Sequence, residues 1–149
     1  MQGRPDNFPA VTPYLIVPDP AAAIDFYVAA FGAREIFRQA RPDGSVGHAE
    51  IVIDDSPIML APEFEFGGVK TRAPKNLGAA SAHVFLYVPD VDARLERARA
   101  AGATEVMPAA DQPHGDRMGG VADPFGHVWW FATFHPDRAP VMKTRFSKT

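Results

Sequence analysis

Residues 115–134, GDRMGGVADPFGHVWWFATF, decide how this chain folds. In their middle, residues 123–126 (DPFG) place a proline and a glycine where a tight turn between two strands requires them. The run that follows, residues 127–134, is too apolar for a surface strand and too rich in aromatic side chains for a helix. We therefore expect a strand that is covered on both faces, by a helix on one side and by a ligand, a partner or another part of the chain on the other.

The composition argues against several classes of function. The chain has 149 residues, of which 46% are hydrophobic, so it can bury a real core. Its net charge of −3 argues against nucleic acid as the main partner, because binding phosphates requires a basic surface. The only basic cluster, Lys143, Arg145 and Lys148, is typical of a solvated tail. The absence of cysteine excludes disulfide bonds, a thiolate nucleophile and cysteine-ligated metal sites.

Targeting and catalytic motifs are missing from the sequence. It contains no apolar segment of a secretory signal peptide and no apolar run near the roughly 20 residues of a membrane-spanning helix. We therefore expect a soluble, cytoplasmic protein without a membrane partner. It also lacks a serine at a strand-to-helix elbow and a glycine-rich loop that opens a helix, so neither a serine nucleophile nor a phosphate-binding loop is predicted.

One pattern, a strand, a helix and three further strands, is predicted twice. The motif VPD at residues 17–19 recurs at 88–90, and FGAREI at 31–36 matches AGATEV at 101–106. A repeat of about 70 residues is too short to close a core alone, so the two copies should pack into one unit. We predict one domain over residues 1–149, with a first βαβββ module at 11–61, a connecting loop at 62–80, a second βαβββ module at 81–135 and a C-terminal tail at 136–149.

Side chains alternate between the two faces of a strand, and this alternation predicts which of them face the helices. The helix side should bury Leu15, Val17, Ala49, Ile51, Ile53, Val84, Leu86, Val88, Trp129 and Phe131. The opposite face then collects Tyr14, His48, Glu50, Met59, His83, Phe85, Tyr87 and Trp130. A surface that faces only water is not built from so many aromatic residues. We predict that this face is concave and binds a small, flat, partly apolar molecule.

The paired copies, the VPD and FGA segments that flank the first helix, and the ending GDRMGGVADPFGHVWWF resemble the glyoxalase/bleomycin-resistance/dioxygenase superfamily, also called the vicinal oxygen chelate proteins. The ending is most similar to the PhnB-like branch, and the resemblance covers about residues 10–135. It implies an α+β fold, with a curved mixed sheet around a cleft, and commonly a homodimer. In metal-using members, one His or Glu from the first and last strand of each copy binds a divalent ion, which chelates two adjacent oxygens of the substrate.

The family's metal positions correspond here to Thr12, Met59, His83 and Trp130. Only His83 is a ligand of the expected kind. Threonine is a poor metal ligand, the methionine thioether is too soft for Zn, Mg or Mn beside oxygen ligands, and tryptophan cannot coordinate a metal. We therefore predict that the family's usual metal chemistry, and with it a metal cofactor at these positions, is absent.

A displaced metal site is an alternative. His48 and Glu50 share one face of a strand, and His83 could approach them across the cleft. Two imidazoles and a carboxylate would suit one divalent metal such as Zn, Ni or Fe(II). The structural interpretation of the same residues is that Glu50 pairs with Arg117 or Arg34 while His48 forms an ordinary hydrogen bond.

Other features of the sequence leave two interpretations open. Trp130 is either a cleft wall or a stacking surface for an aromatic ligand. Asp116 and Arg117 either bind a ligand carboxylate or form an internal salt bridge that holds the hairpin. Residues 62–80 are either a plain connection or a lid over the cleft, with Phe64 and Phe66 at alternating positions. For His127, which opens a strand directly after a turn, a hydrogen bond within the turn suffices.

Three functions are consistent with these residues. The first is a binding protein, dimeric by resemblance, that holds a small aromatic or amphipathic compound without a metal. The second is a lyase, isomerase or dioxygenase that uses the displaced metal at His48, Glu50 and His83. The third is metal-free acid–base catalysis by Glu50, whose pKa aromatic neighbours would raise by desolvation. We favour the first function.

Overall fold

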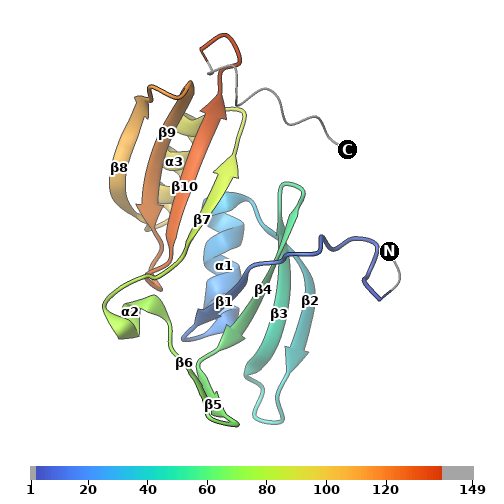
Figure 1. Cartoon of the computed structure of the whole chain (residues 1–149). Coiled ribbons are helices and arrows are strands. Elements are labelled where there is room, and N and C mark those ends of the chain that lie inside the picture. The colour runs from blue at the N-terminus through green and yellow to red at the C-terminus, as the bar shows by residue number, and fades with distance from the viewer. Residues whose placement is uncertain (1–2, 139–149) are drawn as a thin grey trace.

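The computed structural model describes residues 3–138, so the basic cluster of the predicted tail lies outside the described residues. The first module consists of β1 (Tyr14–Val17), α1 (Pro20–Phe31), β2 (Arg34–Ala40), β3 (Val46–Ile53) and β4 (Ser56–Pro62). The connection contains β5 (Phe64–Phe66), β6 (Val69–Thr71) and α2 (Pro74–Leu77). The second module consists of β7 (His83–Tyr87), α3 (Val91–Ala100), β8 (Thr104–Asp111), β9 (Asp116–Ala122) and β10 (Val128–Phe134) (Figure 1).

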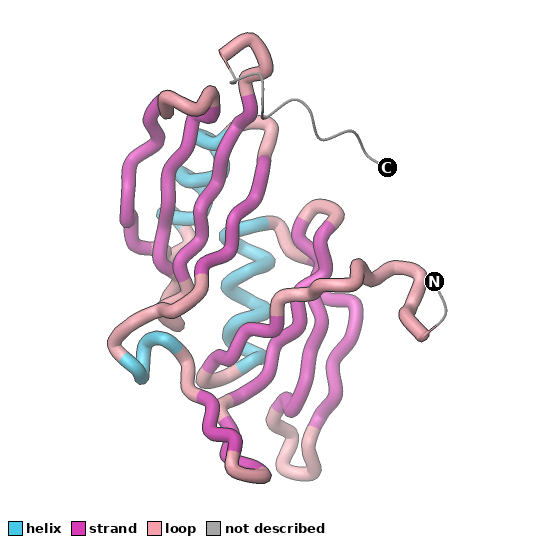
Figure 2. The backbone as a smooth tube through the Cα atoms, in the orientation of Figure 1, coloured by secondary structure: helices cyan, strands magenta, loops and turns pink. Residues whose placement is uncertain are grey.

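Each module forms its own four-stranded mixed sheet. The strand orders are β1-β4-β3-β2 and β7-β10-β9-β8, and the first strand of each module runs parallel to the last. The α+β class with two βαβββ copies is therefore confirmed. Among the described residues the curved surface is made of two separate sheets, whose edge strands β1 and β7 are neighbours, and α1 and α3 lie behind the sheets (Figures 1 and 2).

The two long helices, α1 and α3, both begin at an aspartate. The side chain of Asp19 accepts a hydrogen bond from the N–H of Ala21, and Asp90 does the same for Ala93, so each aspartate satisfies a free donor at a helix N-terminus. Gly32 ends α1 with a φ of 68°, which a glycine adopts without strain. No helix in the part of the chain from residue 3 to residue 138 is long and apolar enough to cross a membrane.

One hydrophobic core extends through both modules. Of the residues predicted to face the helices, eight are at most 8% exposed and the other two, Val84 and Leu86, are partly buried against the same core. Aromatic rings join the modules at its centre, because Phe31 of α1 contacts both Trp129 and Phe131 of β10, with ring centroids 4.7 and 5.2 Å apart. The prediction from strand alternation is therefore confirmed on the helix side.

The buried carboxylate of Asp123 explains why the DPFG turn organises the chain. Its two oxygens accept four hydrogen bonds, from the Tyr27 hydroxyl at 2.6 Å, the Trp129 indole N–H at 2.8 Å, and the backbone N–H groups of Phe125 and His127 at 2.9 Å each. A buried charge is tolerated when it is hydrogen-bonded in this way. Burial, and then the neighbouring Asp123 carboxylate, raise the pKa of the Tyr27 hydroxyl well above its usual value.

The same turn also connects the second module to the first module and to the linker. The ring of His127 donates from Nε2 to the backbone oxygen of Ile16 in β1, at 2.7 Å, and the Lys75 N–H in α2 donates to the Phe125 oxygen at 2.9 Å. The expected hydrogen bond within the turn is made by the backbone of His127, whereas its ring makes a contact between modules that the sequence did not predict.

A second connection between the modules lies on the helix side, where α1 packs against α3. Arg94 and Arg97 of α3 donate to backbone oxygens of the last turn of α1, at Phe31, Ala29 and Val28. The last carbonyl groups of a helix lack partners within the helix and carry partial negative charge, so guanidinium groups stabilise this end. The two modules are thus joined at their helices as well as at the DPFG turn, while the edge strands β1 and β7 belong to separate sheets.

Candidate functional site

The eight residues predicted to line the cleft form two hydrogen-bonded or stacked groups, one on each sheet. The first group comprises Tyr14, His48, Glu50 and Met59, on β1, β3 and β4. The second comprises His83, Phe85, Tyr87 and Trp130, on β7 and β10.

A hydrogen-bond chain runs across the first sheet. The Tyr14 hydroxyl lies 3.1 Å from Nδ1 of His48, and Nε2 of His48 lies 3.3 Å from Oε1 of Glu50. The side chains of His48 and Glu50 are 22% and 20% exposed, so the chain is sheltered without being buried. The alternative in which Glu50 pairs with Arg117 or Arg34 is wrong for residues 3–138, because Glu50 contacts His48 and Arg117 binds Asp92 and Asp111.

Aromatic rings dominate the second sheet. The indole N–H of Trp130 donates to Nδ1 of His83 at 3.0 Å, and the rings of Phe85 and Tyr87 meet with centroids 5.2 Å apart. Gly120 permits this arrangement, because a Cβ atom at that position would lie 2.6 Å from a carbon of the Trp130 ring. The sequence analysis missed Gly120, although the pair of glycines at residues 119–120 inside a strand marks a close approach of this kind.

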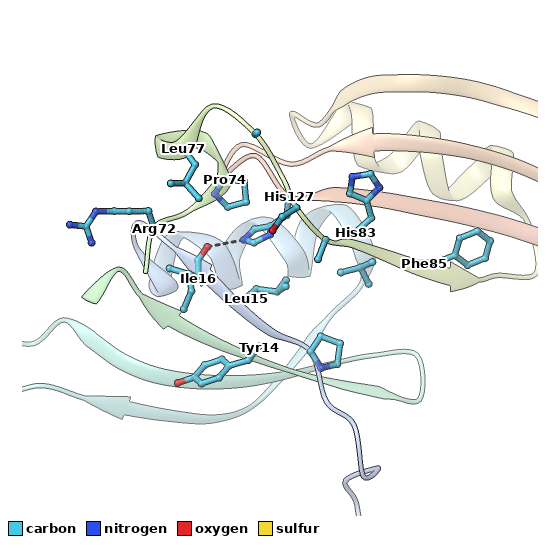
Figure 3. Close-up of a pocket in the computed structure, with 14 residues that line it drawn as sticks. Tyr14, Leu15, Ile16, Arg72, Pro74, Leu77, His83, Phe85 and His127 are labelled. Carbon is cyan, nitrogen blue, oxygen red and sulfur yellow. Dashed lines mark hydrogen bonds between the residues drawn. The ribbon is translucent and has the colours of Figure 1, made fainter. Parts of the chain in front are cut away.

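A pocket of about 440 Å³ lies between the edges of β1 and β7 (Figure 3). Three of the predicted residues, Tyr14, His83 and Phe85, line it. The sequence analysis missed its other lining residues, which are Pro13, Leu15, Ile16, Arg72, Pro74, Leu77, Ala79, Ser81, Ala82, Val84 and His127. Most of them are apolar, and several come from the linker, so the seam between the two sheets is a hydrophobic site with a few polar groups.

The linker approaches this pocket through α2 and not through the predicted lid. Pro74 and Leu77 of α2 line the pocket, whereas Phe66 at the end of β5 is 82% exposed. The hairpin of β5 and β6 extends away from both large sheets in Figure 1. The structure therefore does not place Phe64 and Phe66 over the cleft.

Two further hollows adjoin the sheets. One of about 400 Å³ is lined by Gly3, Arg4, Pro5, Phe8, Pro9, Ala10, Thr12, Glu50 and Met59, which places residues 3–10 against the face of the first sheet. Another of about 330 Å³ lies between the β3–β4 turn and β7 and shares Phe85 with the seam pocket. Six of the eight residues are therefore distributed over these three hollows, while His48 and Trp130 line none of the three. Within residues 3–138 the eight do not gather around the single hollow that we expected.

The residues at the family's metal positions do not fit a metal ion. Thr12 and Met59 line one hollow, while His83 lies in another and uses its Nδ1 atom to accept the Trp130 N–H. The displaced site is not formed either. His48 and Glu50 are in contact but His83 does not join them, and residues 3–138 hold no group of three or more His, Asp or Glu side chains that could bind a metal ion.

Arg117 and Asp116 have structural roles. Arg117 donates to both carboxylate oxygens of Asp92, at 2.7 and 2.9 Å, and its hydrogen bonds lower the pKa of Asp92 below the usual value. Asp116 is 2% exposed and accepts a hydrogen bond from the Tyr87 hydroxyl at 3.2 Å. The internal salt bridge is therefore the correct interpretation of Arg117, and Asp116 orients one of the cleft tyrosines.

Comparison with known proteins identifies the family of this chain. The model of the glyoxalase/bleomycin resistance protein/dioxygenase superfamily matches residues 9–131. An uncharacterized protein of Mycobacterium bovis is 48% identical over 122 residues, which are 81% of this chain and 80% of that protein. The crystal structure of TioX from Micromonospora sp. ML1 is 32% identical, with a TM-score of 0.69, over 84% of this chain and 98% of that one. A PhnB protein from Bacillus cereus, 14% identical with a TM-score of 0.61 over 84% and 99% of the two chains, shares the fold.

Proposed function

Because the chain belongs to the glyoxalase/bleomycin resistance protein/dioxygenase superfamily, we propose that it binds a small aromatic or amphipathic compound in the seam between β1 and β7. The observation that carries the proposal is the pocket of about 440 Å³ in this seam, whose lining is mainly apolar and includes Tyr14, Phe85 and His83. A concave, mainly apolar pocket with a few polar groups is the usual form of a small-molecule site. The proposed binding needs no metal.

The aromatic residues beside the pocket support this proposal. Tyr14, Phe85 and Tyr87 are 52%, 45% and 53% exposed, although their side chains are large and mainly apolar. Apolar surface of this kind is typical of a ligand site or an interface. We propose in addition that the protein is a homodimer, in which a second copy covers part of these faces, and sedimentation velocity measures this directly.

Thermal unfolding of the full chain tests the binding function. We expect 2-methoxynaphthalene, a flat aromatic probe, to raise the melting temperature in the presence and absence of EDTA, because ligand that binds only the folded state stabilises it. Phe85→Ala should abolish the rise. Phe66→Ala is the matched control, since Phe66 is an exposed phenylalanine outside the pocket. No rise with the unmodified protein, either for this probe or for its hydroxyl analogue 2-naphthol, would refute the proposal.

The hydrogen-bond chain favours a second candidate function, metal-free acid–base catalysis. Glu50 is not an isolated base that aromatic residues desolvate, since His48 contacts it. In this function Tyr14 takes a proton from the substrate while its own proton passes to His48, and Glu50 stabilises the imidazolium that forms. Solvent deuterium that enters a bound compound with an acidic C–H bond, and fails to enter it with Tyr14→Phe, would establish this activity.

A further inference from the structure

We infer that the compound bound at this site carries a hydrogen-bond donor on an aromatic ring, a phenolic hydroxyl or a ring N–H, and that the Tyr14 hydroxyl oxygen accepts it. The inference rests on the proposed binding function and names its ligand class. It depends on the order of donors and acceptors along the chain from Glu50 through His48 to Tyr14.

The order is set at the Glu50 end. An ionised carboxylate has no proton and can only accept, so His48, when its imidazole is neutral, must carry its proton on Nε2, which faces Glu50 at 3.3 Å. Nδ1 then has a free lone pair and can only accept. The Tyr14 hydroxyl, 3.1 Å away, must therefore donate its one proton to His48.

The consequence for a ligand appears at the Tyr14 end of this hydrogen-bond chain. Once its proton is engaged with His48, the Tyr14 oxygen offers only lone pairs to a ligand, and each hydrogen bond in such a chain strengthens the next. Tyr14 is 52% exposed, and its ring lines the seam pocket while its hydroxyl extends over the first sheet (Figure 3). A ring that stacks on Tyr14 therefore brings its substituent to an acceptor.

The net charge of these three hydrogen-bonded side chains also disfavours a ligand carboxylate and favours a ligand donor. With a neutral His48, the group of Tyr14, His48 and Glu50 carries the single negative charge of the carboxylate. A ligand carboxylate placed at the Tyr14 oxygen would meet an acceptor and a negative charge, and both disfavour it. Arg72, whose guanidinium belongs to the residues lining the seam pocket, is 3.9 Å from the Glu65 carboxylate and donates to the Thr71 backbone oxygen at 2.7 Å.

Three probes with the same ring system test the inference by titration calorimetry at neutral pH. They are 2-naphthol, which has a donor, 2-methoxynaphthalene, which has only an acceptor, and 2-naphthoate, which has a carboxylate. We expect 2-naphthol to bind about 5–10-fold more tightly than 2-methoxynaphthalene, the effect of one hydrogen bond, and 2-naphthoate to bind no better than 2-methoxynaphthalene. Equal affinities for the first two, or a preference for 2-naphthoate, would overturn the inference and leave the binding function standing. If no probe binds, the binding function itself fails.

Two variants separate the acceptor from a structural role of the same residues. Tyr14→Phe keeps the ring and removes the oxygen, so the affinity for 2-naphthol should fall to that for 2-methoxynaphthalene, which should not change. His48→Leu frees the Tyr14 proton, which can then donate to a methoxy oxygen, so the preference for 2-naphthol should narrow because 2-methoxynaphthalene binds more tightly. If the preference persists unchanged in folded Tyr14→Phe, Tyr14 is not the acceptor.

Discussion

The two copies of the βαβββ module have the same strand pairing but present different surfaces to the cleft. In the first module Glu50 lies opposite Met59, and in the second the equivalent pair is Gly120 and Trp130. The first sheet therefore has room for a carboxylate and its hydrogen-bond chain, whereas the second gives that space to an indole ring. In the second sheet the missing side chain of Gly120 makes room for the Trp130 ring on the neighbouring strand, so the same strand pairing supports a polar half and an aromatic half.

The turns between the last two strands differ in the same way. In the first module Asp54 and Asp55 form an exposed two-residue turn, while the second module has the buried turn that begins at Asp123. The Asp123 side chain accepts hydrogen bonds from both modules, since Tyr27 belongs to the first and Trp129 to the second. The first turn also contacts the other module, but at the surface, where Arg94 of α3 donates to both carboxylate oxygens of Asp54 at 3.1 Å. The two turns therefore differ in burial: the second joins the copies inside the core, and the first joins them at the surface.

The largest effect is expected from the buried turn at Asp123, which joins the copies inside the core. Asp123→Ala leaves the buried Tyr27 hydroxyl and Trp129 N–H without their acceptor, and should reduce the free energy of unfolding by about 3–5 kcal/mol. Asp55→Ala is the matched control in the exposed turn and should have little effect. Urea unfolding followed by tryptophan fluorescence measures both, and equal losses would show that the two turns do not differ as described.

A smaller loss of stability is expected when Gly120 in the second sheet is replaced by a residue that has a side chain. In Gly120→Ala the new methyl group would lie within 2.6 Å of the Trp130 ring, so the ring must shift and the protein should lose about 1–3 kcal/mol. The equivalent change in the first module, Glu50→Ala, adds no atoms and should lose less, below about 1 kcal/mol. A shifted Trp130 emission spectrum in folded Gly120→Ala, with none in Glu50→Ala, would distinguish the two positions.

The contact between Tyr27 and Asp123 also predicts a pH dependence. The folded state raises the pKa of Tyr27 above the ordinary value of 10.0, so above this pH the unfolded chain loses the proton before the folded protein does. Unfolding then releases a proton, and stability should fall as the pH rises from 10.0. Tyr27→Phe should show a weaker decline in chemical unfolding experiments between neutral and alkaline pH. An identical decline in both proteins would mean that Tyr27 does not join the copies through this hydrogen bond.

The smallest effect is expected from Arg117, whose ion pairs lie within the second module. Arg117→Gln removes its contacts with Asp92 and Asp111. Because these groups are on the surface, the change in stability should be small and should diminish further at high salt. The Arg117 hydrogen bonds lower the pKa of Asp92 below 3.8, so their contribution is present above that pH and is lost as the pH falls below it. Unfolding midpoints at several salt concentrations test this, and a large loss that salt does not change would contradict it.

The fold could be predicted because it depends on local patterns that occur twice. Asp19 and Asp90 cap helices, and residues such as Ile51 and Trp129 alternate toward the helices with none of their surface exposed. Such signals need no knowledge of distant neighbours. The same alternation identified the side chains of the opposite face, including Tyr14 and Phe85.

The arrangement of the site could not be predicted in the same way. Alternation assigns Tyr14 and His83 to a face, but it does not tell how far apart the edges of β1 and β7 lie, because no hydrogen bonds join them. The hydrogen bond from His127 to Ile16 joins residues that are far apart in the sequence. Leu77 lines the pocket because of the path that the linker takes back to the sheets. These features come from the packing of one module on the other, which has no periodic signal.

The bond between His127 and Ile16 has a consequence for solubility. A strand at the edge of a sheet exposes unpaired backbone groups, and these can pair with a strand of another molecule. The strand β1 is such an edge strand. Because its Ile16 oxygen accepts the His127 N–H, this oxygen is one acceptor fewer for a strand of another molecule that pairs with β1. The imidazole that holds the two modules together thereby also protects an open edge against aggregation.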